Sequence, residues 1–412
     1  MQVEESAFNS SLHTLHPEPD RFPAKNRLAR ISRNPLGALC LAALLAGSSA
    51  LAQTNIVLGL QLYAGVSISG TVGSNYLIQY VTNLSQTNNW QTLTNITLTS
   101  SPYLWVDTTT PATGRRFYRA EAPPGTNQPA TPAGMALVPA GYFLMGDDID
   151  GEADAPTNTV YVSAFYMDTN LVTYNLWQKV YQWAVTNGYT FDDSGNGVGT
   201  NFPVQTIDWF DTARWCNARS QMAGLPPVYF TNSGLTQIFK AGEPTVYANW
   251  TVAGYRLPTE AEWEKSARGG MTGARFPWGN TISESLANYY GDPYNGNYGY
   301  TYDQGPAGPN SNFDSGSYPA GYTSPVGYFA PNGYGLTDMA GNTFEWCWDW
   351  YGAYATTTQT NPIGPITGTN RVLRGGSWIH FANECRTAFR NDYPPDFADD
   401  ELGFRSVLPQ NP

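Results

Sequence analysis

The 412-residue chain carries little positive charge, with 21 Lys and Arg against 33 Asp and Glu and a net charge of -12. No cluster of Lys or Arg lies outside the first residues. Proteins that bind DNA or RNA need such clusters because the phosphate backbone is polyanionic. We therefore expect no nucleic-acid partner.

Cysteine and histidine are also scarce, with four and three residues. Cys40 lies in an N-terminal apolar run, which leaves Cys216, Cys347 and Cys385 in the rest of the chain. Three thiols form at most one internal disulfide, so a disulfide-scaffolded fold is excluded. His380 is the only histidine beyond residue 16, and catalysis that needs an imidazole must use it.

The apolar run Leu36–Ala46 is too short to span a bilayer as a helix. Four basic residues precede it, and the small-residue segment Ala50-Leu51-Ala52 follows it. This order is typical of an export signal cleaved near Ala52, and a buried helix of the folded domain is the alternative. We expect residues 1–52 to be a leader and signal peptide. The mature protein is then secreted, periplasmic or on the cell surface, without stable membrane insertion after cleavage.

Residues 54–120 have the pattern of β-structure. Segments such as Tyr76–Val81 and Tyr103–Val106 are rich in β-branched and aromatic residues, and clusters of Asn, Thr, Ser and Gly separate them. We predict a small all-β sandwich that serves as a spacer or adhesion module. Prolines and glycines in residues 121–134 indicate a linker.

Three helices are predicted in the second domain, which we place at residues 135–410. Apolar residues at helical spacing indicate a helix over Thr173–Val185. A second helix runs from Asp208, as N-cap, to Ala223. The third begins with a capping box of Thr259 and Glu262 and ends before two glycines. Residues 275–335 are rich in Gly, Tyr, Asn and Pro and should hold little regular structure.

The third helix carries three carboxylates in its first turns, Glu260, Glu262 and Glu264. An acid/base role is one reading of them. Carboxylates in a first helical turn usually serve the cap and the helix dipole, and we adopt that structural interpretation.

The stretch Asn332–Trp350, NGYGLTDMAGNTFEWCWDW, combines glycine turns with aromatic residues that must be buried. Asp338 and Glu345 are its central acidic side chains, with the Met339 and Gly341 carbonyls between them. Calcium prefers such oxygen-rich, charged surroundings. Spacing alone favours the alternative, in which both carboxylates cap turns.

Six blocks of sequence occur in an order that closely resembles the sulfatase-modifying factor family, whose founding activity is the formylglycine-generating enzyme. The blocks are ALVPAGYFLMG, YRLPTEAEWEKSARGG, FPWGN, PNGYGLTDMAGNTFEW, RVLRGGSW and LGFR. The resemblance spans roughly Ala136 to Leu408 and leaves out the β-module. It implies an α+β fold, a variant of the C-type-lectin-like fold with little regular structure, and calcium sites that hold its loops in place.

The resemblance implies two sites for structural Ca²⁺. Carried over residue by residue, the first falls on two carboxylates and two carbonyls: Asp338, Met339, Gly341 and Glu345. The second begins at Asn288 and the Tyr289 carbonyl, with Asp314 as a candidate acidic ligand. The first of these sites coincides with the oxygen-rich segment found within Asn332–Trp350. We therefore favour a calcium site there over carboxylates that only cap turns.

The family's oxidase uses two cysteines after the GGS segment to bind copper and activate oxygen, because soft thiolates suit Cu(I). Here the first position is His380 and the second is Cys385. Ser377 is kept, and Phe344 stands where the family has a tryptophan that lines the active site. Ser377, His380 and Cys385 are thus the candidate catalytic residues. One thiolate cannot form a two-coordinate copper–dithiolate centre, so we expect neither copper nor ordinary formylglycine-generating activity.

Two further arrangements of this segment stay open. His380, Glu384 and Cys385 offer ligand types for zinc or copper, against a buried packing thiol and a surface-loop histidine. A disulfide between Cys347 and Cys385 would leave Cys216 as the single thiol.

Three function classes follow. The first is a binding protein that presents Trp378–Glu384 and Asn391–Glu401 to a protein or carbohydrate ligand. The second is an oxidase acting on a sulfatase cysteine, and the third is another enzyme on the same scaffold. We place binding first because the thiol pair is incomplete and because the appended β-module favours surface recognition.

Overall fold

The computed structural model describes residues 64–68, 75–82, 90–98, 102–109, 116–121, 131–149, 155–292, 300–314 and 322–410. The predicted leader and signal peptide, and most of the predicted linker, lie outside these residues. None of the helices in the described ranges is long and apolar enough to cross a membrane.

The described residues of the N-terminal β-module form five strands in two antiparallel sheets. β1 (Ala64–Ile68) pairs with β4 (Tyr103–Asp107), and β2 (Asn75–Val81) lies between β3 (Gln91–Thr97) and β5 (Phe117–Glu121). Ile68, Ile78 and Leu98 are the buried centre of its small core. The two alternating segments read from the sequence are strands β2 and β4, so the predicted β-structure is confirmed there.

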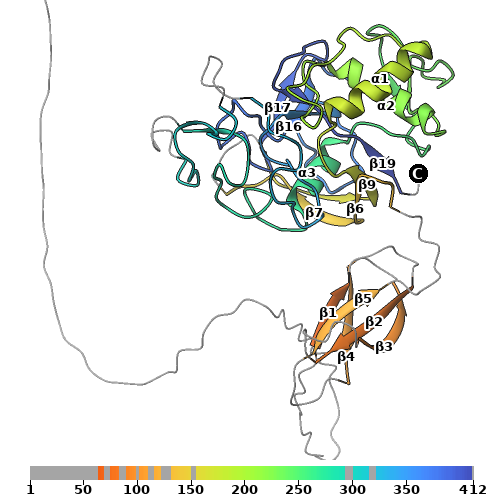
Figure 1. Cartoon of the computed structure of the whole chain (residues 1–412). Coiled ribbons are helices and arrows are strands. Elements are labelled where there is room, and N and C mark those ends of the chain that lie inside the picture. Colours follow the sequence, from red (N-terminus) through yellow and green to blue (C-terminus); the bar gives the residue numbers. More distant parts are fainter. Residues whose placement is uncertain are drawn as a thin grey trace, which may run out of the picture. The chain divides into compact units, whose positions relative to one another are not determined.

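In its described residues, the second domain consists of short strands and three helices, with the first two helices of the chain side by side at one side and the third among the strands (Figure 1). Its largest sheet has the order β17 (Asn391–Tyr393), β16 (Arg371–Arg374), β14 (Phe344–Trp350) and β18 (Leu402–Gly403). β14 and β16 are antiparallel, with Glu345 opposite Arg374. The two sequence blocks that contain these strands, PNGYGLTDMAGNTFEW and RVLRGGSW, therefore lie side by side.

The described residues of the domain also form four smaller sheets. One contains β15 (Gln359–Thr360), β8 (Asn158–Val162) and β7 (Gly141–Met145), and another contains β19 (Val407–Pro409), β9 (Phe165–Asp168) and β6 (Met135–Val138). The two-stranded ones are β10 (Tyr229–Phe230) with β11 (Tyr247–Ala248), and β12 (Tyr290–Gly291) with β13 (Gly308–Pro309).

All three predicted helices are present. α1 (Tyr174–Thr186) and α2 (Trp209–Met222) pack against each other and have the side chains of Thr173 and Asp208 as N-caps. α3 (Glu260–Arg268) begins with the predicted capping box and ends at a left-handed glycine, Gly269. In the described part of residues 275–335 the regular elements are the two-residue strands β12 and β13, as the composition predicted.

The carboxylates of α3 have the structural role that we expected, and they achieve it through buried ion pairs as well as capping. Glu262 accepts from the Thr259 backbone N–H and pairs with Arg256 at 2.6 Å. Glu264 pairs with Arg374 of β16 at 2.5 Å, and Glu260 pairs with a more distant arginine described below. α3 is thereby fixed to the central sheet by charge as well as by packing.

Candidate functional site

The loop after β16 contains the three candidate catalytic residues. Ser377 is fully buried, and its Oγ lies 2.6 Å from Nδ1 of His380. The same Nδ1 lies 3.1 Å from Oε2 of Glu401, at the start of the turn that leads into β18. The Phe344 ring of β14 stands edge-on to the imidazole, with centroids 4.8 Å apart. Phe344 therefore borders this site, as its position in the resemblance implied.

The electrostatics of this site favour an uncharged imidazole. Burial lowers the pKa of His380 to about 4. Burial, together with the nearby charge of Asp399, raises the pKa of Glu401 to about 7. Near neutral pH the imidazole is thus neutral, and the carboxyl group is about half protonated.

Ser377, His380 and Glu401 do not form a proton relay. In a Ser-His-acid triad the serine and the acid contact different imidazole nitrogens. Here both contacts go to Nδ1, and the serine hydroxyl is inaccessible to a substrate. The contacts among these three residues hold the loop after β16 in place. The sequence motifs did not reveal that Glu401 belongs to this site.

Cys385 is a buried packing thiol. It lies in a hydrophobic cluster with Phe276, Tyr289 and Ala382, and burial raises the pKa of its thiol well above the usual value. The loop can approach it this closely because Gly376 has no side chain: a Cβ there would lie 2.6 Å from the Cys385 Sγ. A neutral, enclosed thiol is a poor nucleophile and a poor metal ligand.

The disulfide considered between Cys347 and Cys385 is not formed. Both residues, and Cys216, are free and buried, and each belongs to a different hydrophobic cluster. The sequence could not decide this because the two stretches do meet, but their thiols enter separate cores.

His380, Glu384 and Cys385, the alternative metal site, are not among the groups of close potential ligands in the described residues. Within the described residues, the groups of three potential ligands that come within 4.8 Å of one another lie elsewhere, around the N-terminus of α2, with members from the loop before α2 and from the loop between β10 and β11. They are Asp192, Asp208 and Glu243, and Asp193, Asp208 and Asp211. These acidic clusters have the spacing to bind a metal.

At the first predicted calcium site, one of the four predicted ligands, Glu345, already pairs with an arginine side chain. Both Glu345 oxygens accept from Arg405, at 2.7 and 2.8 Å, and both side chains are fully buried. Arg405 also donates to the Asp338 carbonyl at 3.2 Å. A guanidinium therefore already supplies the positive charge that Glu345 requires.

The other three predicted ligands fit a cation better. Asp338 is 6% exposed, its backbone has a φ of 56°, and its Oδ1 is buried with no hydrogen-bond partner in the described chain. Hydrogen bonds within the described residues do not reach the Met339 and Gly341 carbonyl oxygens. Unpartnered buried oxygens are costly, and a bound cation would satisfy them.

The second predicted calcium site adjoins the first. Asn288 forms an isolated parallel bridge with Gly341, and its carbonyl accepts from the Asn342 N–H at 2.7 Å. The Asn288 side-chain amide donates to the Tyr322 carbonyl. Asp314 is exposed and borders residues outside the described ranges. The structure thus brings the start of the second site beside the first without defining an acidic ligand.

The predicted recognition surface has an aromatic and acidic character. Ile379 is 40% exposed and Phe397 is 37% exposed, and the Phe397 ring packs on Tyr393 with centroids 4.7 Å apart. Trp378, by contrast, is buried and cannot contact a ligand. Burial, together with the nearby charge of Asp399, raises the pKa of the Asp400 carboxyl, so acidic groups lie close together on this surface.

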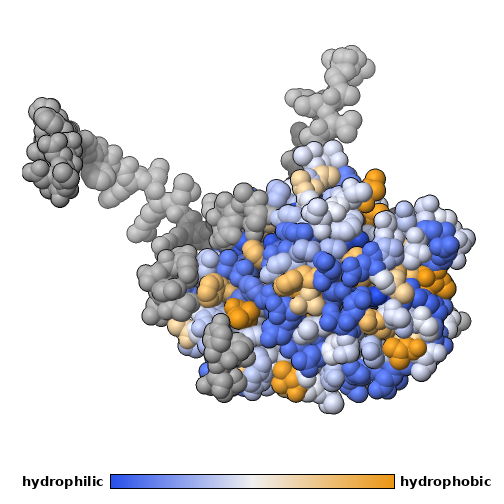
Figure 2. Space-filling view, turned by 90° about the horizontal axis from the view of Figure 1, so that it is seen from above, coloured by the Kyte–Doolittle hydropathy of each residue, from blue (hydrophilic) through white to orange (hydrophobic). Residues whose placement is uncertain are grey.

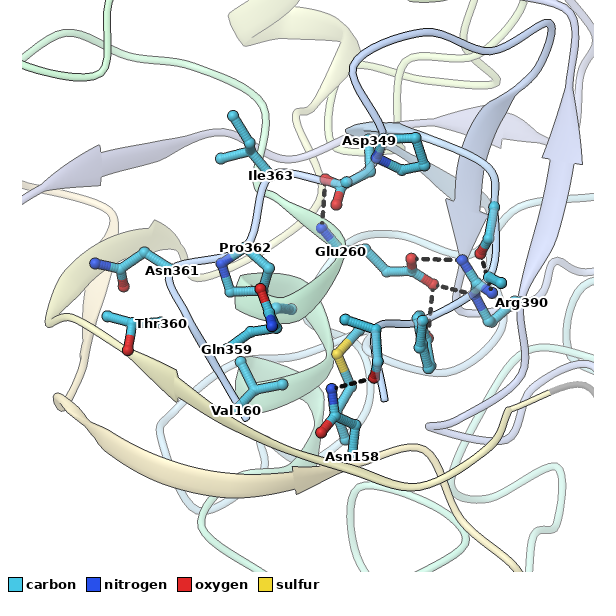
Figure 3. Close-up of a pocket in the computed structure, with 18 residues that line it drawn as sticks. Asn158, Val160, Glu260, Asp349, Gln359, Thr360, Asn361, Pro362, Ile363 and Arg390 are labelled. Atoms are coloured by element: carbon cyan, nitrogen blue, oxygen red, sulfur yellow. Dashed lines mark hydrogen bonds and ion pairs between the residues drawn. The ribbon is translucent and has the colours of Figure 1, made fainter. Parts of the chain in front are cut away.

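A separate cavity of about 470 Å³ lies between α3 and the loop that connects β14 to β16 (Figure 3). Glu260 stands at its centre, paired with Arg390 at 2.5 Å and hydrogen-bonded through its backbone N–H to Asp349 at 2.9 Å. Burial, with the charge of Glu260, raises the pKa of Asp349 to about 8. Side chains such as Asn158 and Gln359 add neutral polar groups. Sequence reasoning missed this cavity, because its charged groups come from three separate segments.

On the face shown in Figure 2, hydrophobic residues lie singly or in small groups among hydrophilic ones. Such a distribution is normal for a protein surface and marks no broad apolar interface on that face. Recognition through this face would depend on local features.

Comparison with known proteins supports the resemblance that was read from the motifs. Residues 120–409 match the model of the sulfatase-modifying factor enzyme 1-like domain. The formylglycine-generating enzyme of Bos taurus is 31% identical over 327 residues, which cover 73% of this chain and 82% of that protein. The formylglycine-generating enzyme of Streptomyces coelicolor is 31% identical over 315 residues, which cover 69% of this chain and 93% of that protein.

Two further relatives have other names. The "chaperone protein LppX" of Paenibacillus barcinonensis is 29% identical over 284 residues, covering 66% of this chain and 88% of that protein. The solved structure of "Treponema denticola variable protein 1" is 29% identical, with a TM-score of 0.51, and covers 67% of this chain and 94% of that chain. The likeness confirms the expected fold class, an α+β variant of the C-type-lectin-like fold with little regular structure.

Proposed function

Because the chain belongs to the sulfatase-modifying factor family, we propose that it is a secreted binding protein on the family's scaffold, without ordinary formylglycine-generating activity. The observation that carries this proposal is the state of the thiol position. His380 replaces one cysteine of the pair, and the remaining thiol of Cys385 is fully buried.

The chemistry of oxidation supports the proposal. Copper chemistry of the family type needs two thiolates as soft ligands, and thiol exchange with a substrate needs an accessible thiolate. Cys385 meets neither requirement because burial keeps its thiol protonated. His380 offers only an imidazole nitrogen, which is a harder ligand than a thiolate, and its Nδ1 is already in contact with Ser377 and Glu401.

The proposed recognition surface comprises the exposed parts of Trp378–Glu384 and Asn391–Glu401. Aromatic side chains supply rigid contact area, and the surrounding carboxylates favour a protein or carbohydrate partner that carries basic or hydroxyl groups. One relative is named as a chaperone protein, and that name, which describes a role other than cysteine oxidation, supports the proposal.

Structural calcium is part of the proposal, with a revised ligand set. Asp338 and the carbonyls of Met339 and Gly341 have unpartnered oxygens that suit the ion, whereas Glu345 belongs to Arg405. Bound there, calcium would stiffen the loop before β14. The acidic clusters near α2 are an alternative location for a cation.

Secretion is proposed from the export-signal pattern of residues 1–52. Expression of the full chain in a bacterial host with an intact export pathway, followed by fractionation and N-terminal sequencing, tests it. A mature N-terminus near Gln53 in the extracytoplasmic fraction is expected. A cytoplasmic product that retains residues 1–52 would contradict the proposal.

The function is tested with purified protein, copper, oxygen and a peptide containing Cys-x-Pro-x-Arg. The Streptomyces coelicolor enzyme serves as the positive control, and the peptide mass is followed with time. We expect an unchanged peptide with this protein and conversion by the control. Loss of the thiol mass in favour of an aldehyde would establish the alternative, a formylglycine-generating oxidase, which the identity to such enzymes keeps as second candidate.

A further inference from the structure

A second cavity, of about 570 Å³, lies between β10–β11 and the loop that connects β14 to β16. We call it the Arg371 cavity, after the arginine in its lining. Its walls include the aromatic side chains Phe210, Tyr247, Trp348 and Trp350. Ile366, which is 97% exposed, stands at its rim. The cavity shares no residue with the recognition surface proposed above.

Arg371 is buried among indole rings. It is 2% exposed, and its guanidinium carbon lies 3.7 Å from the Trp209 ring centroid and 3.5 Å from that of Trp350. One of its nitrogens, Nη1, donates to the Trp348 carbonyl. Its Nε is buried and has no hydrogen-bond partner in the described chain.

Arg371 differs from the other buried arginines of the described chain, each of which has a carboxylate oxygen within 3.9 Å. They are Arg214, Arg219, Arg256, Arg268, Arg374, Arg386, Arg390 and Arg405. Arg371 forms no such ion pair in the described ranges. A buried, unpaired charge is costly, and cation–π contacts offset only part of that cost.

Burial lowers the pKa of the Arg371 guanidinium to about 9, and two acidic groups act against that shift: first the buried Tyr229 phenol, whose own pKa is raised by burial, and then the Asp349 carboxyl. Burial, with repulsion from Glu260, raises the pKa of that carboxyl to about 8, so near neutral pH it is mostly protonated. Asp349 therefore does not neutralise the guanidinium. An anion from outside would complete the pairing that the chain leaves open.

We propose that the Arg371 cavity binds a carboxylate attached to an apolar ring. The unpaired guanidinium selects the anion, and the aromatic walls select the body that carries it. A sugar acid would need polar partners for its hydroxyl groups. Besides Arg371, the cavity lining offers few polar side chains, such as Glu243, Thr245 and Thr367, so a sugar acid is disfavoured. A free aromatic acid and a protein C-terminus ending in an aromatic residue share this chemistry.

Calorimetric titration of the purified protein with 3-phenylpropionate and with its uncharged amide tests the charge requirement. The acid should bind at least about tenfold more tightly than the amide, since a buried charge-assisted pair is worth that factor or more. Peptides ending in phenylalanine, with a free or an amidated C-terminus, separate the two sources. Tighter binding of the free-ended peptide than of 3-phenylpropionate would identify a protein terminus. The opposite order would identify a small acid.

Arg371→Gln should weaken binding of the acid by about tenfold and leave the amide unchanged, provided that thermal denaturation shows a folded protein. Ile366→Lys and Ile366→Asp are the matched pair that does not depend on core stability, because residue 366 is almost fully exposed. Ile366→Lys adds a positive charge near the cavity and should strengthen acid binding by about twofold to threefold, and Ile366→Asp adds a negative charge and should weaken it by about the same factor. Equal affinities for acid and amide, equal affinities in the two Ile366 variants, or no saturable binding of any probe at millimolar concentration would overturn the proposal.

Discussion

Glu345→Gln is the substitution that best tests whether the Glu345 carboxylate pairs with Arg405 or binds calcium. The substitution keeps the size of the side chain and removes the charge that pairs with Arg405. Both side chains are fully buried, and breaking such a pair by neutralising one partner costs on the order of 3 kcal/mol or more. At about 2–4 °C per kcal/mol for a domain of this size, the unfolding midpoint should fall by about 6–12 °C.

The calcium dependence of that loss is the decisive feature. If Glu345 belongs to Arg405, Glu345→Gln should lower the midpoint by the same amount with excess calcium and with a chelator. Asp338→Asn should instead remove the difference between the two conditions, because Asp338 provides an unpartnered buried oxygen. Asparagine tolerates the positive φ of residue 338, so the variant tests charge rather than backbone strain.

Differential scanning fluorimetry in calcium and in chelator, on the parent protein and the variants, makes the measurement. Asp148→Asn is the control, because it removes one carboxylate from an exposed position of the same domain and should shift the midpoint little. If Glu345→Gln abolishes the calcium response, Glu345 is a ligand and the assignment of that carboxylate to Arg405 is wrong. If the parent protein shows no calcium response, the calcium proposal at Asp338 fails.

Three further predictions concern the loop after β16. In the folded protein the pKa of His380 is about 4 and that of Glu401 is about 7. Between pH 4.5 and 6.5 the folded protein therefore has a neutral imidazole and a protonated Glu401, whereas the unfolded chain has a protonated imidazole and an ionised Glu401. Stability thus rises with pH through His380 and falls through Glu401, so denaturation should show opposite slope changes in His380→Asn and Glu401→Gln. Cys385 should resist a soluble disulfide reagent until denaturant exposes it, and rapid labelling of the native protein would contradict its burial. Gly376→Ala should lose about 3 kcal/mol in urea denaturation, from a clash with the Cys385 sulfur and a positive φ, whereas Gly335→Ala, which has open space, should lose about 1 kcal/mol.

Local sequence signals predicted the helices well because each start is decided by neighbours in the chain. Thr173, Asp208 and Thr259 each accept from a backbone N–H three residues ahead, so the side chain that caps and the N–H that it satisfies lie within one turn. For the helix starts, the decisive interaction is therefore encoded within a few residues of the element that shows it.

The candidate sites were harder to predict because their decisive partners come from far away in the sequence. Asp338 and Glu345 lie in one segment of the sequence, but Arg405, which pairs with the Glu345 carboxylate, lies 60 residues after Glu345. Glu401 approaches His380 from the turn before β18. Nothing in the spacing of Cys347 and Cys385 shows that the two thiols enter different cores. Tertiary packing decides which of several chemically suitable partners is reached.

The two arginines of β16 show how this limit bears on function. Arg371 and Arg374 are three residues apart on one strand and therefore point to opposite faces of the sheet. Arg374 meets Glu264 of α3 at 2.5 Å, whereas Arg371 meets only indole rings and a carbonyl among the described residues. From the motif RVLRGGSW the two look equivalent, yet one is neutralised within the chain and the other is not. A buried guanidinium that the fold leaves unpaired beside a cavity is therefore a stronger indication of an anionic ligand than the motif itself.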